Sequence, residues 1–305
     1  MSNHYANLLM QAEKLYRHNR QGSYKTKERY YEAFKRFLRF VAEEYRLEKL
    51  QNLSGKHMHS YFVHLKKKGL AASTIKTEAS AIRFWHDQIP NAKHHLPRNV
   101  DLSLERRRYG SVDRTWTDAE FNNIILECYG AQRLDYEACI VIARYAGLRI
   151  HEVMRIDTAI VRDALKTGVI TIRGKGGRGR SVPINEQIRI ELESFRSHTK
   201  PGQKLFVPDG RETHEVIKEF QRFIREHRQR IPPPDSDRTA KLTFHGLRHT
   251  YAAEQYTRLR KSGLSALDAR RQVAGLLGHG RDDVTRLYLA GVDESQFWES
   301  GDGDV

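Results

Sequence analysis

The chain has few cysteines, no long apolar run and no export signal. Its two cysteines, Cys128 and Cys139, lie in helical patterns without the spacing of metal ligands, so we expect reduced core thiols in a cytoplasmic protein. No stretch of about 18 apolar residues is present. The start MSNHYANLLMQAEKLYRHN lacks the charged, apolar and cleavage regions of a signal peptide. Neither membrane insertion nor export is expected.

Motifs of several enzyme classes are also missing. There is no HExxH or CxxC pattern, and no cluster of Asp and Glu that indicates a catalytic metal. The glycine-rich stretch GKGGRGR at 174–180 lacks the order of a phosphate-binding P-loop. The HMH triplet at 57–59 lies in a helical pattern, where residues two apart point in different directions. Its two histidines are therefore not expected to bind one metal ion. We therefore expect no metal and no cofactor.

Acidic residues are outnumbered by basic ones. Lys and Arg total 53 against 38 Asp and Glu, which gives a net charge of +15. Residues 1–110 hold 22 basic and 10 acidic side chains, whereas the tail at 291–305 holds five acids and no base. Such a chain attracts polyanions, of which nucleic acid is the usual one. A membrane surface is the rival partner, but the basic residues are spread over several segments rather than gathered on one amphipathic anchor.

The first third of the chain predicts four helices with a basic polar side. Apolar residues recur at helical spacing in four segments, and Ser73 is expected to cap the last of these helices. The basic residues proposed to face DNA are Lys25, Lys27, Arg29, Lys76 and Arg83. Each of them taken alone is typical of a solvated surface. Together with the charge excess of this third, they predict a side that faces nucleic acid.

The remainder predicts a second, mainly α domain with one β-hairpin. Residues 87–114 lose periodicity and form a linker, and Thr117–Glu120 (TDAE) starts a helix with a capping box. A buried helix, DYEACIVIARYAG, breaks at Gly147 and resumes as LRIHEVMRI. The segment GVITIRGKGGRGRSVPI predicts a hairpin, followed by a helix, the loop IPPPDSD and further helices. We expect domains at 1–110 and 111–305.

Several cationic or imidazole residues lie at predicted element boundaries. They are Arg149, Lys175, His245, Arg248 and His279. Each one alone is typical of a surface charge or a helix cap, and Arg149 has a local partner in Glu152 one turn later. Tyr288 follows His279 by nine residues on the helix that RDDVTRLYLA predicts, where a tyrosine is usually a core residue. In a basic chain without a metal motif, the five together predict a cradle for a phosphodiester.

These residues stand in four segments that resemble the ordered motifs of the tyrosine recombinase (phage integrase) family. The segments are YAGLRIHEV, GKGGRGRSVPI, FHGLRHTYA and LLGHGRDDVTRLYLA, and the helical first third resembles that family's core-binding domain. The resemblance implies a C-shaped clamp around double-stranded DNA, with a helical SAM-like core-binding domain and a catalytic domain. One departure follows Tyr288, where the chain reads YLAGV although many relatives have a histidine two residues after the tyrosine.

The resemblance implies that four of these residues bind or organise the scissile phosphate. Arg149 and Arg248 would grip its non-bridging oxygens, since the planar guanidinium suits bidentate contacts and stays charged. His279 would donate to the same phosphate in the transition state. Glu152 would hold Arg149.

It also implies the residues that move protons and form the covalent bond. Tyr288 would attack phosphorus, form a 3′-phosphotyrosyl link and expel a 5′-hydroxyl, with His245 as the candidate base. Lys175 would protonate the departing 5′-oxygen. His249 is expected to be structural. The covalent link conserves the bond energy, so neither ATP nor metal is expected.

These implications predict a site-specific DNA recombinase that acts as a homotetramer on two DNA sites. The sequence does not distinguish integration, excision and resolution of a mobile element or replicon, and it does not reveal the target site or accessory proteins. One rival is a type IB topoisomerase, which would cut without preference for one site. Another is a DNA-binding regulator with an inactive site, which would form no covalent adduct.

Overall fold

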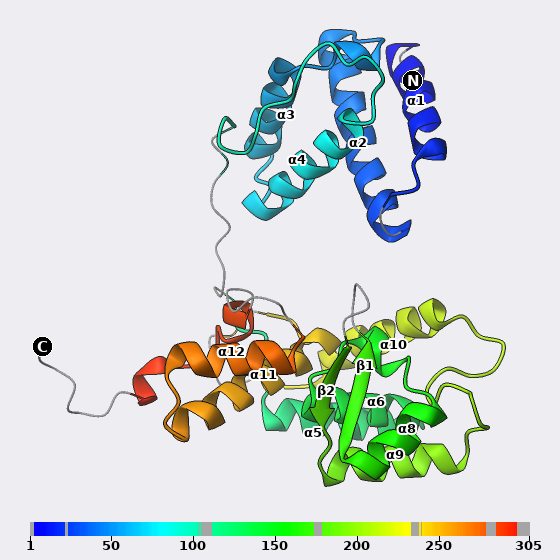
Figure 1. Ribbon diagram of the computed structural model, residues 1–305, viewed down its shortest axis with the longest axis vertical. Coiled ribbons are helices and arrows are strands. Elements are labelled where there is room, and N and C mark those ends of the chain that lie inside the picture. The colour runs from blue at the N-terminus through cyan, green and yellow to red at the C-terminus, as the bar shows by residue number, and fades with distance from the viewer. Residues whose placement is uncertain are drawn as a thin grey trace, which may run out of the picture. The chain divides into compact units, whose positions relative to one another are not determined.

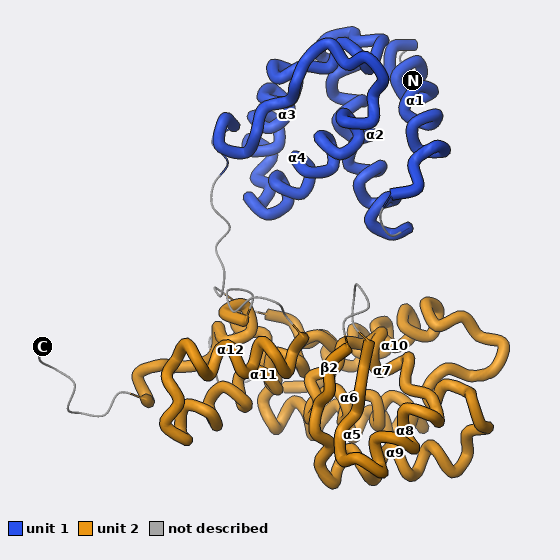
Figure 2. The backbone as a smooth tube through the Cα atoms, viewed as in Figure 1, with its two compact units in different colours: residues 1–108 blue, residues 109–305 orange. Residues whose placement is uncertain are grey.

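The chain divides into two compact units, residues 1–108 and 109–305 (Figure 2). The computed structural model describes residues 3–21, 24–102, 104, 112–173, 179–232, 238, 240–278 and 285–297. Within these ranges the regular structure is mostly helical, with one two-stranded antiparallel sheet, as the sequence predicts. No helix in the described ranges has both the length and the apolar character that a membrane span requires.

Unit 1 is a helical bundle with an aromatic core. Its α-helices are α1 (Asn3–His18), α2 (Tyr24–Tyr45), α3 (Gly55–Lys67) and α4 (Ala72–His86), and a short 3₁₀ helix, η1 (Leu50–Asn52), precedes α3 (Figure 1). α2 packs against the other three α-helices. The ring of Trp85 on α4 is fully buried beside Tyr31 and Phe34 of α2. Replacing such an indole by alanine typically costs about 3–5 kcal/mol of unfolding free energy.

Two details of unit 1 concern its predicted caps and histidines. The cap predicted at Ser73 is wrong: the N-cap is Ala71, two residues earlier, because the N–H groups of Thr74 and Ile75 both bond to the carbonyl of Ala71. His57 is buried and its Nδ1 accepts the backbone N–H of Ser54 at 3.1 Å, which caps α3. His59 is exposed, so the HMH pair does not converge on one point.

Unit 2 surrounds the buried helix α6. Its elements are α5 (Asp118–Gly130), α6 (Leu134–Ala146), α7 (Ile150–Val153), α8 (Thr158–Thr167), β1 (Val169–Arg173), β2 (Gly179–Pro183), α9 (Glu186–Ser197), α10 (Thr213–His227), η2 (Arg228–Arg230), α11 (Phe244–Lys261), α12 (Ala266–Leu276), η3 (Arg286–Tyr288) and η4 (Glu294–Phe297) (Figure 1). α6 contacts α5, α7, α9 and α11. Cys128 and Cys139 are buried free thiols in this core, as predicted.

The predicted capping box and hairpin of unit 2 are confirmed. Thr117 Oγ1 accepts the N–H of Glu120 at 3.2 Å, and the Glu120 carboxylate accepts the N–H of Thr117 at 2.9 Å. β1 and β2 pair in antiparallel register, with Ile170 opposite Val182.

Elsewhere in unit 2 the structure differs from the prediction. The segment LRIHEVMRI forms only the four-residue α7, and α8 was not anticipated. Two α-helices, α9 and α10, rather than one lie between the hairpin and the loop IPPPDSD. The first residues of the helix predicted by RDDVTRLYLA lie outside the described residues, and within them Tyr288 ends the 3₁₀ helix η3.

Candidate active site

A buried carboxylate, Glu152, organises the cationic cluster of unit 2. Its side chain is 0% exposed. The carboxylate accepts the N–H of Arg149 at 2.8 Å and the Nη1 of Arg149 at 2.9 Å. It also accepts Nη2 of Arg180 at 2.8 Å, and Nη1 of Arg248 lies 3.9 Å away. Three guanidinium groups from α7, β2 and α11 therefore share one carboxylate, which leaves a surplus of positive charge.

The protonation of Glu152 follows from this environment. Burial raises the pKa of the Glu152 carboxyl, but the charge of Arg180, the hydrogen bond from the Arg149 N–H and the charges of Arg149 and Arg248 outweigh burial, so the pKa is lowered overall. The group is ionised at neutral pH. A buried charge that is paired in this way fixes the groups around it, because separating them would leave it uncompensated.

Arg248 is completely buried at the start of α11. Its Nη1 donates to the carbonyl of Gly147 at 2.6 Å, and its Nη2 donates to the carbonyl of Leu277. Burial, together with the charges of Arg180 and Arg149, lowers the pKa of Arg248 to about 10, so the guanidinium stays charged at neutral pH. Its two carbonyl partners come from the end of α6 and the end of α12, and they hold the guanidinium in one orientation.

Gly147 is required by the backbone and by the packing at this point. It caps α6 with φ at +61°, in the left-handed region that favours glycine. A Cβ here would overlap the ring of Tyr251 on α11. The glycine thus ends α6, lets α11 approach, and turns its carbonyl towards Arg248.

Tyr288 is packed among the side chains of the first turns of α11. It is 6% exposed, and its ring centroid lies 4.4 Å from that of His249 and 5.6 Å from that of His245. The guanidinium carbon of Arg248 lies 5.6 Å from the same ring. The structure therefore brings Tyr288 to the arginine cluster, although 40 residues separate it from Arg248 in the sequence. His249, which we expected to be structural, lies closer to the Tyr288 ring than His245 does.

His245 is solvent-exposed at the edge of the cluster. Desolvation by neighbouring protein atoms, and then the charges of Arg248, Arg149 and Arg114, lower the pKa of His245 to about 4. The imidazole is therefore neutral at neutral pH and has a nitrogen available to accept a proton. Burial, and then the neighbouring His245, lower the pKa of His249 to about 3.

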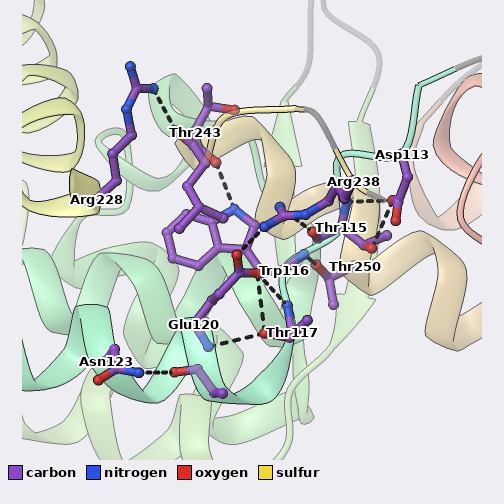
Figure 3. Close-up of polar contacts among 12 residues, drawn as sticks. Asp113, Thr115, Trp116, Thr117, Glu120, Asn123, Arg228, Arg238, Thr243 and Thr250 are labelled. Atoms are coloured by element: carbon purple, nitrogen blue, oxygen red, sulfur yellow. Dashed lines mark hydrogen bonds and ion pairs between the residues drawn. The ribbon is translucent and has the colours of Figure 1, made fainter. Parts of the chain in front are cut away.

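The first described residues of unit 2, including Thr115 and Trp116, contact the start of α11 (Figure 3). The N–H of Trp116 donates to Oγ1 of Thr250 at 2.7 Å, and its indole N–H donates to the carbonyl of Thr243 at 3.1 Å. Arg238 binds the Thr115 carbonyl at 2.9 Å and the carboxylate of Glu120. The helix that carries His245 and Arg248 is thereby tied to the first turn of α5.

A pocket of about 430 Å³ adjoins the cluster between α7, α10 and the start of α11. Its cationic and imidazole lining residues are Arg149, His151, Arg225, Arg228 and His245. Its lining residues include no carboxylate, and Ile150, Ile224, Leu242 and Phe244 add apolar surface. The pocket thus suits an anion attached to a less polar group. In the described part of the chain, no group of three or more His, Cys, Asp or Glu residues is arranged to hold a metal ion.

The structure thus gathers most of the predicted site. Arg149, Glu152, His245, Arg248 and Tyr288 lie together in unit 2. Lys175 and His279 lie outside the described residues.

The five basic residues proposed to face DNA in unit 1 differ in whether their side chains already contact other groups of the protein. Lys27 donates to the carbonyl of Asn19 at 2.6 Å and lies over the ring of Tyr16, and Arg83 donates to the carbonyl of Pro97 at 2.9 Å. Lys25 and Arg29 are exposed, and Lys76 is half-buried.

Sequence reasoning missed Arg180. Strand alternation could have found it, because Arg180 lies on the same face of β2 as the buried Val182, where an arginine needs a partner. The segment drew attention for its glycines and Lys175, and the partners of Arg180 are distant in the sequence.

Comparisons with known proteins agree with this fold and identify a family. Residues 115–294 match the model of the phage integrase family, and residues 13–88 match the phage integrase N-terminal SAM-like domain. The tyrosine recombinase XerC of Pediococcus pentosaceus is 23% identical, with 88% of each chain covered.

Solved structures of similar fold include complexes with DNA. The XerH site-specific recombinase bound to palindromic difH substrate is similar with a TM-score of 0.62 and 18% identity, covering 94% of this chain and 82% of that one. A lambda integrase tetramer bound to a Holliday junction is similar with a TM-score of 0.60 and 16% identity, covering 94% and 78%. Because the family model spans more than half of the chain, this protein belongs to the phage integrase family of tyrosine recombinases.

Proposed function

We propose that the protein is a site-specific DNA recombinase that cleaves and rejoins duplex DNA through a 3′-phosphotyrosyl intermediate. The observation that carries the proposal is the packing of Tyr288 against Arg248, within a cluster that also holds Arg149 on the buried Glu152. A surplus of fixed positive charge beside a phenol suits attack on a phosphodiester, whose charge grows in the transition state.

In this mechanism the Tyr288 oxygen attacks phosphorus while the bond from phosphorus to the 5′-oxygen breaks. The phenol proton passes to His245, and the 5′-oxygen takes a proton from Lys175. The negative charge of the bound phosphate would raise the low pKa of His245, which makes that imidazole a better base once DNA is in place. Arg149, Arg248 and His279 neutralise the non-bridging oxygens. The energy of the broken bond is kept in the tyrosyl ester, so rejoining needs no ATP.

In the proposed architecture, the core-binding domain with its linker at residues 1–110 grips DNA, and the catalytic domain at residues 111–305 carries out the chemistry. The two would close around the duplex as a C-shaped clamp, and four copies would exchange strands between two sites in the cytoplasm. The similarity to a lambda integrase tetramer on a Holliday junction supports this assembly. Lys25 and Arg29 are the best placed of the unit 1 candidates, because their side chains are exposed.

Covalent capture tests this function directly. Purified protein would be mixed with fragmented DNA from its own source, including the flanks of its gene, and only protein-linked DNA would be sequenced after denaturation. Adducts at one sequence are expected and would also reveal the site. Adducts scattered over all sequences would identify a topoisomerase, and retained DNA binding without any adduct would favour a regulator.

Lys175→Ala is expected to slow cleavage by about 10²–10⁴-fold, because general acid catalysis of the leaving group is lost. A substrate with sulfur in place of the 5′-oxygen needs no protonation and should restore the rate. The measurement is single-turnover adduct formation on both substrates. Equal defects on the two substrates would assign the general acid to another group.

Arg225→Gln is expected to reduce the number of DNA phosphates that the protein neutralises. Arg225 is exposed on α10 and lines the anion-binding pocket beside Arg149. Loss of one contact should make the slope of log affinity against log salt shallower by about 0.9. The control is Arg222→Gln, because Arg222 lies on the same helix, is paired with Glu226 and does not line the pocket. An unchanged slope for Arg225→Gln would exclude a phosphate from this contact.

A further inference from the structure

Arg180 joins three parts of the candidate active site. It lies in β2, and its side chain is 7% exposed. Its Nη2 donates to Glu152 at 2.8 Å, and its Nη1 donates to the carbonyl of Leu277 at the end of α12. Its aliphatic part packs on Gly278, where a Cβ would lie 3.0 Å from the Arg180 Cδ. One side chain thus connects the hairpin with α7 and with the segment after α12.

Both acceptors of Arg180 are shared with Arg248. The carbonyl of Leu277 accepts from each of the two guanidinium groups, and Glu152 lies within ion-pair distance of each. A displacement of Arg180 would therefore remove a hydrogen-bond donor from Glu152 and from the Leu277 carbonyl. Those two groups in turn hold Arg149 and Arg248. Both terminal nitrogens of Arg180 donate to groups that also contact Arg248, so Arg180 can act on the site through them.

We propose that Arg180 is a positioning residue for DNA cleavage: it fixes Glu152 and the Leu277 carbonyl, so that Arg149 and Arg248 are held in place to bind the scissile phosphate. The inference rests on the proposed function. It adds to the predicted catalytic set a residue that acts through other side chains.

Charge supports the same conclusion. The described charged and titratable groups around Glu152 are Arg149 and His151 on α7, Arg180 on β2 and Arg248 on α11. Burial favours the protonated form of Glu152, and Arg180 is the largest of the charges that oppose it. Without that charge the pKa of Glu152 should rise. Acidification would then protonate a larger share of Glu152 and weaken its hold on Arg149.

A purely structural role makes different predictions. In a purely structural role, loss of Arg180 would act through unfolding alone, because it would leave the buried Glu152 charge less compensated. In that case the cleavage defect would follow thermal stability and would not depend on pH in the folded range. A positioning role predicts a defect that grows on acidification and that disappears when Glu152 carries no charge.

The test compares Arg180→Gln, Arg180→Lys, Glu152→Gln and the double variant Arg180→Gln with Glu152→Gln. Single-turnover adduct formation would be measured from pH 8.5 to 5.5 on a nicked duplex that traps the intermediate, beside DNA affinity and thermal unfolding. Arg162→Gln is the control, since Arg162 is an exposed arginine of the same unit. It should match the unchanged protein.

Arg180→Gln is expected to cleave at least tenfold more slowly at pH 7, with near-normal DNA affinity, and the ratio to the unchanged protein should fall further towards pH 5.5. For Arg180→Lys, the rate relative to the unchanged protein should not depend on pH, because lysine restores the charge. The double variant should be no slower than the slower single variant, since coupled residues are not additive.

Two results would overturn the proposal. One is a normal rate for Arg180→Gln. The other is a defect that is independent of pH and multiplies with that of Glu152→Gln. If Arg180→Gln does not fold, the double variant Arg180→Lys with Glu152→Gln is compared with its two single variants by the same criterion. Failure of the unchanged protein to form any adduct would instead refute the proposed function, so the two failures are distinguishable.

Discussion

Replacing Tyr288 by phenylalanine is expected to abolish DNA cleavage and to leave DNA binding intact. The ring of Tyr288 packs against His249 and near Arg248, and phenylalanine keeps those contacts while it removes the oxygen that would attack phosphorus. Loss of a nucleophile that acts with its neighbours as a unit can cost about 10⁶-fold in rate. We expect no covalent adduct by denaturing gel analysis, with a normal shift of the duplex under native conditions.

Tyr145→Phe is a suitable control for this prediction. It removes a phenol oxygen from a half-buried tyrosine of α6 in the same unit, whose ring contacts Phe121. Its cleavage rate should be unchanged. Normal strand cleavage by Tyr288→Phe would refute the assignment of the nucleophile, and with it the phosphotyrosyl mechanism proposed here.

Replacing Arg248 by lysine is expected to reduce the rate of DNA cleavage by about 10²–10³-fold. This is the usual effect of removing one preorganised donor that stabilises charge developing in the transition state. Lysine preserves the charge, but its single ammonium group cannot reproduce a fork that spans the Gly147 and Leu277 carbonyls. A buried carbonyl would lose its donor, so unfolding free energy should also fall, by about 1–3 kcal/mol. Single-turnover cleavage and thermal unfolding measure the two effects separately.

The matched control for Arg248→Lys lies on the same helix. Arg258 is exposed, and its Nη2 donates to Gln255 at 2.6 Å. Arg258→Lys should therefore change cleavage and stability little. If Arg248→Lys lost stability but cleaved at the normal rate, Arg248 would be a structural anchor and not a ligand of the phosphate.

Local sequence patterns determined most of the secondary structure. The apolar stripes of residues 1–86, the capping box at Thr117 and the glycine-rich hairpin each depend on neighbours within a few residues, and the structure confirms them. The capping prediction at Ser73 failed because the N–H groups of Thr74 and Ile75 bond to the carbonyl of Ala71, which makes Ala71 the N-cap. The spacing of the motifs also indicated the family, which the family models confirm.

Only the tertiary structure decided which side chains meet at the candidate site. Arg180 and the Leu277 carbonyl are 97 residues apart, and Arg248 and the Gly147 carbonyl are 101 apart, so no local pattern links them. Packing of β2 and α11 around Glu152 brings the arginines together, because a buried carboxylate must be paired. The sequence by itself determined most of the helices, the hairpin and the family, since these follow from residue types at short spacing. The arginine cluster and the contacts of Tyr288 were decided by how those elements pack.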